Sequence, residues 1–132
     1  MTASLEAETT VREFVDRINA HDPSAIVSCC TPGHVFTDSL GAKLSGPARL
    51  ERAWIGYFAL FPDYRIEVES MASAAELVLL TGWASATLRT PQGVPGSSWR
   101  IPAAWRAVVS SRRIAEWQVY ADNKPVYELL AG

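Results

Sequence analysis

Apolar positions near the N-terminus recur at the spacing of an amphipathic helix. Four of them fall at i, i+3, i+4 and i+7, namely Val11, Phe14, Val15 and Ile18. This pattern predicts a helix that starts with Thr9 or Thr10 as its cap and ends near His21.

A capping position followed by proline predicts the start of two more helices. Asp22 and Pro23 begin a short predicted helix that ends at residues 31–33. The apolar residues that it buries are Ile26, Val27 and Cys30. The segment 45–47 (Ser-Gly-Pro) begins a third predicted helix, which ends at residues 61–63. The apolar stripe of this helix is largely aromatic and consists of Leu50, Trp54, Tyr57, Phe58 and Phe61.

Beyond residue 63 the apolar period changes to two, which is typical of strands. The strands predicted along the chain cover residues 34–38, 64–72, 77–89, 99–109 and 114–121. Gly82 predicts a bulge or bend in the second long strand. We expect a loop at residues 91–98, a turn at 110–112 and a short tail at 125–130. Helices followed by an antiparallel meander predict one α+β domain over residues 1–132, with the helices on one face of a curved sheet.

The composition indicates a compact globular protein without a basic surface. The 132 residues are 48% hydrophobic and 20% charged, and the net charge is −2. Nucleic acids and anionic membranes attract proteins with an excess of basic residues, so we expect neither as a partner.

The N-terminal segment and the cysteines bear on the compartment. Residues 1–8 have neither the basic start nor the apolar core of a signal peptide, and no apolar run is long enough to span a bilayer. The two cysteines, Cys29 and Cys30, are adjacent, and neighbouring cysteines rarely form a relaxed disulfide. Two unpaired thiols suit a reducing interior, so we expect a cytoplasmic protein.

Five segments of the chain carry a resemblance to a known superfamily. They are residues 14–22 (FVDRINAHD), 34–41 (HVFTDSLG), 61–63 (FPD), 101–104 (IPAA) and 114–122 (IAEWQVYAD). With the order of predicted elements, they resemble the nuclear-transport-factor-2-like superfamily, and within it the SnoaL-like and ketosteroid-isomerase-like proteins. The resemblance covers nearly the whole chain, but its motifs are loose, so it defines the fold better than the function.

The resemblance implies a cone-shaped, cystatin-like α+β fold. In this fold, N-terminal helices pack on a strongly curved, mainly antiparallel sheet that encloses a hydrophobic pocket. Members often form homodimers through the outer sheet face. Their known activities include ketosteroid isomerisation, polyketide ring closure, dehydration and epoxide hydrolysis, and many relatives only bind ligands or proteins.

Two aspartates at the ends of predicted strands match acids of the family. The resemblance places Asp38 at the carboxylate that moves the proton in ketosteroid isomerases. It places Asp122 at the acid/base aspartate of SnoaL-like cyclases. The oxyanion donors of the isomerases fall near Phe14 and near Ala103 or Ala104, which have no donor group. We therefore do not expect steroid isomerisation by the usual chemistry.

Each candidate acid or base also has a structural explanation. Strand alternation puts Asp122 on the polar face of the last strand, so it is a base if that face lines the cavity and a cap for the tail if it does not. Asp38 is either a second base and polar anchor or the first residue of an Asx turn. His34 is either a proton shuttle and ligand donor or a structural histidine.

The expected pocket wall is mainly aromatic. The residues predicted to bind the ligand are Phe14, Trp54, Tyr57, Trp99, Gln118 and Tyr120. On this assignment Trp117 lies on the other face of its strand, at the outer sheet surface. An exposed tryptophan there favours a homodimer through that surface.

These inferences predict an enzyme that holds a small, hydrophobic, oxygenated molecule and catalyses cyclisation, isomerisation or dehydration. Asp122 is the expected base, with Asp38 or His34 as the second polar group. No cofactor is expected, because proton removal beside a carbonyl needs only a base and a donor for the enolate. No metal is expected either, because the histidines and cysteines lack the spacing of metal ligands. The alternatives are a non-catalytic binder of small ligands and a dimeric interaction module whose cone is closed.

Overall fold

The computed structural model describes residues 3–89 and 95–131. The helices are α1 (Ala3–Asn19), α2 (Pro23–Ser28), α3 (Pro47–Leu60) and α4 (Lys124–Ala131). The strands are β1 (Cys30–Thr37), β2 (Lys43–Ser45), β3 (Arg65–Ala74), β4 (Leu77–Arg89), β5 (Pro95–Ser110) and β6 (Arg113–Ala121).

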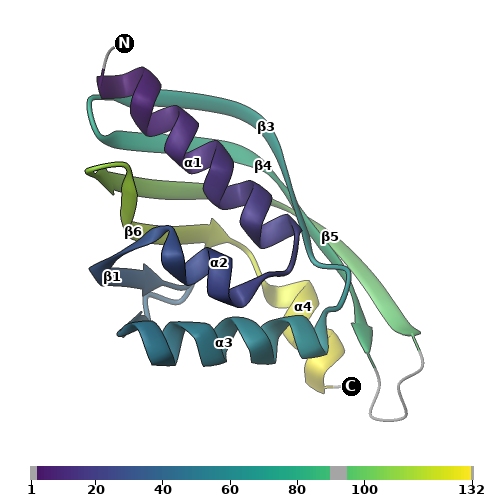
Figure 1. Cartoon of the computed structure of the whole chain (residues 1–132). Coiled ribbons are helices and arrows are strands. Elements are labelled where there is room, and N and C mark those ends of the chain that lie inside the picture. Colours follow the sequence, from purple (N-terminus) through teal and green to yellow (C-terminus); the bar gives the residue numbers. More distant parts are fainter. Residues whose placement is uncertain (1–2, 90–94, 132) are drawn as a thin grey trace.

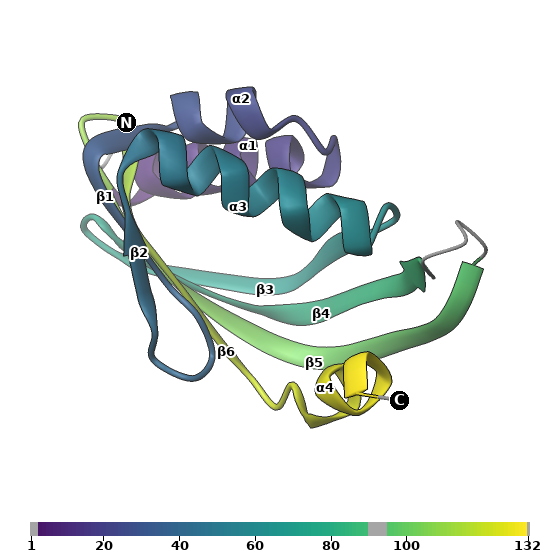
Figure 2. The same cartoon turned by 90° about the horizontal axis from the view of Figure 1, so that it is seen from below.

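The strands form a curved sheet in the order β2-β1-β6-β5-β4-β3. Neighbouring strands are antiparallel except for β1 and β6, which are parallel. The helices α1, α2 and α3 cover one face of the sheet (Figure 1). The helix α4 follows β6 and lies beneath the C-terminal end of α3 in Figure 2. This arrangement confirms the α+β architecture predicted from the sequence.

The helix starts follow the capping rules only in part. Asp22 caps α2 as predicted, because its side chain accepts a hydrogen bond from the Ala25 N–H at 3.1 Å. The prediction that Thr9 or Thr10 caps α1 is wrong, since α1 begins at Ala3. Both hydroxyls lie inside the helix and donate to the carbonyls four residues earlier.

The strands agree with the predicted pattern, with extensions at several ends. The bounds of β4 are those predicted, whereas β1 begins at Cys30 rather than at His34. Residues 95–98, predicted as loop, belong to β5, and residues 91–94 of that predicted loop lie outside the described residues. The predicted tail is the helix α4.

Gly82 lies opposite a break in the β3–β4 register, as its position in the strand predicted. The register shifts between Val68 and Ser70, directly across from Gly82. A Cβ atom at Gly82 would lie 1.9 Å from the Glu67 carbonyl oxygen, so any side chain here would collide with backbone. Glycine therefore permits the close approach of the two strands that bends the sheet.

The apolar side chains of β5 and β6 point toward the helices. In the register of these two strands, Trp105 faces Val119 and Ala107 faces Trp117. Trp117 is 1% exposed, and its ring packs edge-on against Phe14 of α1 at 4.9 Å. The prediction that Trp117 lies on the outer sheet surface is therefore wrong, because the core takes the apolar face of β6.

Candidate functional site

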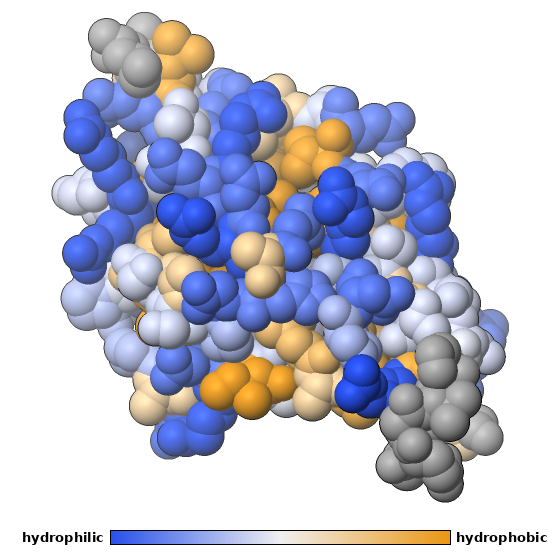
Figure 3. Space-filling model, turned by 45° about the vertical axis from the view of Figure 1, so that its right-hand side comes forward, coloured by the Kyte–Doolittle hydropathy of each residue, from blue (hydrophilic) through white to orange (hydrophobic). Residues whose placement is uncertain are grey.

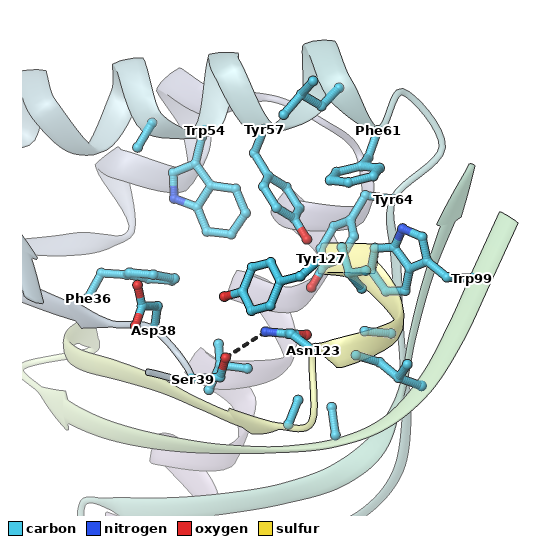
Figure 4. A pocket seen from close by; sticks show the side chains of 18 of the residues that line it. Phe36, Asp38, Ser39, Trp54, Tyr57, Phe61, Tyr64, Trp99, Asn123 and Tyr127 are labelled. Atoms are coloured by element: carbon cyan, nitrogen blue, oxygen red, sulfur yellow. Dashed lines mark hydrogen bonds between the residues drawn. The ribbon is translucent and has the colours of Figure 1, made fainter. Parts of the chain in front are cut away.

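A pocket of about 370 Å³ lies between α3, α4 and the concave face of the sheet. Its wall is largely aromatic, as predicted, and Figure 4 shows these rings converging on it. The aromatic residues that line it are Phe36, Trp54, Tyr57, Phe61, Tyr64, Trp99, Trp117 and Tyr127. Three alanines of the sheet line it as well: Ala84, Ala103 and Ala121. Large rings around small floor residues leave a cavity of the size used for small organic ligands.

Contacts between aromatic rings keep the part of the pocket wall formed by α3 and its neighbours rigid. The α3 residue Trp54 packs edge-on against Phe36 of β1, with centroids 6.1 Å apart. Farther along α3, Tyr57 contacts Phe61 and Tyr64, each at 5.0 Å. Edge-to-face packing of this kind adds to the burial of apolar area and holds each ring in one orientation.

Asp38 stands at the end of β1 and is among the residues that line the pocket. Its Oδ1 accepts hydrogen bonds from the backbone N–H groups of Leu40 at 2.9 Å and Ala42 at 3.0 Å. This is the predicted Asx turn, so the turn and the pocket position occur together. The two N–H groups orient the carboxylate, and Oδ2 has no hydrogen-bond partner among the described residues.

Polar groups from α4 and from the residue before it complete this side of the pocket. The Asn123 side-chain amide donates to the Ser39 hydroxyl at 2.6 Å, which joins the start of α4 to the turn after β1 (Figure 4). Tyr127, one turn farther along α4, also lines the cavity. The sequence did not indicate Ser39, Asn123 or Tyr127 as site residues, and for Tyr127 the reason is that residues 125–130 are expected as a tail. The spacing of Val126 and Leu130 was the available signal for a helix.

Two tyrosines lie deep in the wall and remain protonated. Burial raises the pKa of Tyr57 above its usual range, and the nearby Tyr127 raises it further. Burial likewise raises the pKa of Tyr64, with Tyr57 as a second cause. Both phenols are therefore neutral hydrogen-bond donors at any physiological pH. Tyr57 was predicted as a ligand contact, whereas Tyr64 was not.

The predicted site residue His34 lies in the core and not among the residues that line the pocket. Its side chain is 2% exposed, and Nδ1 donates to the Ile114 carbonyl at 2.7 Å. Burial lowers the pKa of His34, although this hydrogen bond and Glu116 oppose the shift. Phe14 is also buried there, next to Trp117, and does not line the pocket.

The other three predicted site residues are Gln118, Tyr120 and Asp122. They lie on the polar face of β6 or directly after this strand, and this face points away from the pocket. Tyr120 is 50% exposed, and neither Tyr120 nor Gln118 lines the cavity. Asp122 is exposed, and its Oδ1 accepts the Lys124 N–H at 3.0 Å at the start of α4. The expectation that this polar face lines the cavity is therefore wrong, and Asp122 has the capping arrangement that was its structural alternative.

The described residues contain no group of three or more His, Cys, Asp or Glu side chains that could hold a metal ion. Within the same residues, no helix is long and apolar enough to cross a membrane. The surface seen in Figure 3 is mostly hydrophilic, with hydrophobic residues in separate patches.

The model of the SnoaL-like domain matches residues 11–117, which is most of the chain. The chain belongs to the SnoaL-like family. Among curated proteins, none matches this SnoaL-like protein.

Solved structures share its fold at low sequence identity. A candidate SnoaL-like polyketide cyclase from Jannaschia sp. CCS1 is 16% identical, with a TM-score of 0.83 over 96% of this chain and 92% of that one. The candidate hydroxylase AclR from Streptomyces galilaeus is 21% identical, with a TM-score of 0.79 over 97% of each chain. TerC, co-crystallised with polyporic acid, is 12% identical, with a TM-score of 0.80 over 96% of this chain and 99% of TerC. Together with the curved sheet, these similarities confirm the predicted cone fold of this SnoaL-like protein.

Proposed function

We propose that this SnoaL-like protein binds a small, hydrophobic, oxygenated molecule in its pocket and moves a proton on it without a cofactor, with Asp38 as the base. The observation that carries the proposal is the position of Asp38, the one carboxylate among the described residues that line the aromatic cavity. This assigns to Asp38 the role that the sequence favoured for Asp122.

The local hydrogen bonds of Asp38 support this role. The two backbone N–H groups that bind Oδ1 fix the plane of the carboxylate. Oδ2 is left to accept a proton, since no described residue donates to it. A general base needs an oriented acceptor within reach of the substrate proton.

The proposed step is proton transfer from carbon. Oδ2 takes a proton from a C–H group conjugated with a carbonyl, the C–H electron pair forms a carbon–carbon double bond, and the carbonyl π pair moves to oxygen. The protonated Asp38 returns the proton to the same carbon or to another one. Return to a different carbon is an isomerisation, and attack of the enolate on a second carbonyl is a cyclisation.

The relatives support small-molecule binding by this fold. TerC was crystallised with polyporic acid, and the Jannaschia protein is a candidate polyketide cyclase. Because both are less than 25% identical to this chain, they leave the ligand open, and the proposal rests on the pocket itself.

Anthrone provides a direct test, since it is an apolar aromatic ketone with an acidic C–H. We expect the wild type to accelerate exchange of the C10 protons of anthrone for deuterium, measured by proton NMR under nitrogen. Asp38→Asn should lower the catalysed rate by roughly 100-fold or more, as expected for loss of a general base. Asp122→Asn is the matched control and should retain the rate.

Two outcomes would redirect the assignment. A rate that falls in Asp122→Asn but not in Asp38→Asn returns the base to Asp122. Binding of anthrone by the wild type without any exchange favours the alternative function, a non-catalytic binder. That alternative is supported by the occupation of Asp38 Oδ1 by two turn hydrogen bonds.

We also propose a second copy of the chain as the partner of the outer sheet face. Leu79 of β4 and Tyr120 of β6 are each 50% exposed. Beside them the Arg100 guanidinium lies over the Trp83 ring at 4.0 Å. Apolar and aromatic side chains on a sheet face are typical of an interface between subunits.

A further inference from the structure

Tyr57 and Tyr64 form a pair at the wall of the pocket, and the pair joins two elements. Tyr57 comes from the last turns of α3, and Tyr64 precedes β3. Their rings meet edge to face, with centroids 5.0 Å apart and planes at 87°. Both residues line the cavity, and in Figure 4 the Tyr57 ring points down from α3 toward it.

The two hydroxyls have no hydrogen-bond partner among residues 3–89 and 95–131. Tyr64 is only 8% exposed, and its hydrogen bonds within these residues are made by its backbone: the carbonyl accepts from His21 Nε2, and the N–H donates to the Phe61 carbonyl at 3.1 Å. Neither hydroxyl is among the fully buried polar atoms that lack a partner, and both residues line the cavity, so the two O–H groups are accessible to a ligand there.

The chemistry of the pair suits a partner that accepts hydrogen bonds, because a protonated phenol offers an O–H. Because burial keeps both phenols protonated, each offers an O–H to the pocket. The rest of the wall around them is aromatic, with Phe61 and Trp99 as neighbours of Tyr57 and Tyr64. An aromatic frame that ends in a carbonyl oxygen fits both features.

Asp38 lies away from this pair, beside Phe36 at the β1 side of the pocket (Figure 4). We propose that the hydroxyls of Tyr57 and Tyr64 together bind the carbonyl oxygen of an aromatic ketone whose acidic C–H lies on the opposite edge of the ring system, toward Asp38. The orientation of the C–H rests on the proposed function of Asp38, whereas the binding of the oxygen does not. When the proton leaves, conjugation carries the electron pair to this oxygen, and the two O–H groups stabilise the negative charge there.

Anthrone and 9,10-dihydroanthracene form a matched pair of probes for this proposal. They share the tricyclic frame and differ in the carbonyl oxygen at C9, which lies opposite the C10 methylene. Quenching of tryptophan fluorescence measures the dissociation constant of each, since Trp54 and Trp99 line the cavity. We expect the wild type to bind anthrone at least roughly 10-fold more tightly than dihydroanthracene, because two hydrogen bonds form in a largely apolar pocket.

The variants Tyr57→Phe, Tyr64→Phe and the double variant remove the hydroxyls and keep the rings. Each single change should reduce the preference for anthrone several-fold, and the double change should abolish it. Tyr120→Phe removes a hydroxyl on the outer sheet face and should leave the preference unchanged. The carbonyl stretching frequency of bound anthrone should rise in the double variant as its hydrogen bonds are lost.

Stability separates a ligand-binding role from a structural one. If the hydroxyls serve the ligand, the double variant without ligand melts close to the wild-type temperature, because no described residue loses a hydrogen bond to either hydroxyl. A wild type that does not prefer anthrone, or a preference that survives the double change, overturns the proposal. Asp38→Asn should keep the preference while it abolishes exchange, so failure of the base assignment and failure of the donor pair give different results.

Discussion

At the scale of single residues, Asp38 and Asp122 show how one residue type at the end of a strand meets two environments. Both accept backbone N–H groups of the residues that follow, as aspartates do in turns and caps. The difference lies in the strand before them, because β1 delivers Asp38 to the cavity and β6 delivers Asp122 to the surface. The local sequence predicts the turn in each case, but it does not predict whether the strand leads to the cavity or to the surface.

His34 leads to a prediction about pH and stability. Its pKa is lowered from 6.5 in the folded protein, chiefly by burial, so the unfolded chain binds a proton more readily. The protein should therefore have its full free energy of unfolding above about pH 6.5. This free energy should decrease as the pH falls toward the pKa of His34 in the folded protein. One such group contributes at most about 1.4 kcal/mol per pH unit.

The variant His34→Asn tests this expectation, because asparagine can still donate to the Ile114 carbonyl but does not titrate. Urea unfolding between pH 7.5 and about 5 should show a shallower loss of stability in the variant than in the wild type. Parallel curves for the two proteins would show that His34 does not contribute to the acid sensitivity.

At the scale of elements, most of the fold was predictable from the sequence, because local patterns determine it. The proline-marked starts of α2 and α3 and the full extent of β4 are examples. The orientation of β6 was not predicted, since alternation divides a strand into two faces without saying which one is inside. The register with β5 decides that, and it places Trp117 and Val119 inward with Trp105.

This register also explains why half of the candidate site was missed. Because the polar face of β6 points outward, Gln118 and Tyr120 do not line the pocket, and the polar groups of the pocket come from other elements. They come from α4 and from Tyr64, which precedes β3, and both are brought to the cavity by tertiary packing rather than by sequence proximity. Trp54, Tyr57 and Trp99, which the sequence predicts as ligand contacts, line the cavity, because large aromatic side chains tend to lie on the inner surface.

The outer faces of β4 and β6 lead to a prediction about association. If Leu79 and Tyr120 lie at an interface between two copies, Tyr120→Glu places a charge in an apolar contact, which is costly without a partner. Sedimentation velocity should show a dimer for the wild type and a monomer for this variant. Trp83→Phe, which keeps an aromatic ring beside Arg100, should remain dimeric, and a wild type that sediments as a monomer refutes the interface.

At the scale of the whole molecule, the fold leaves its centre hollow at one end and packed at the other. The core under α1 is filled by Phe14, Trp105 and Trp117. Toward α3 and α4 the sheet instead presents alanines to the cavity. Small residues there forgo burial of apolar area, which is expected where a protein keeps space for a ligand at some expense of stability.

Filling that space should therefore stabilise the protein and weaken ligand binding. Ala121→Leu adds three carbon atoms at the pocket wall, and burying them should raise the free energy of unfolding by about 1–2 kcal/mol. The same atoms occupy the volume that the ligand needs, so anthrone should bind at least roughly 10-fold more weakly. Ala104→Leu adds the same atoms on the opposite face of the sheet, where Ala104 pairs with Tyr120, and should leave binding unchanged. If Ala121→Leu kept the wild-type affinity for anthrone, the ligand would have to bind elsewhere.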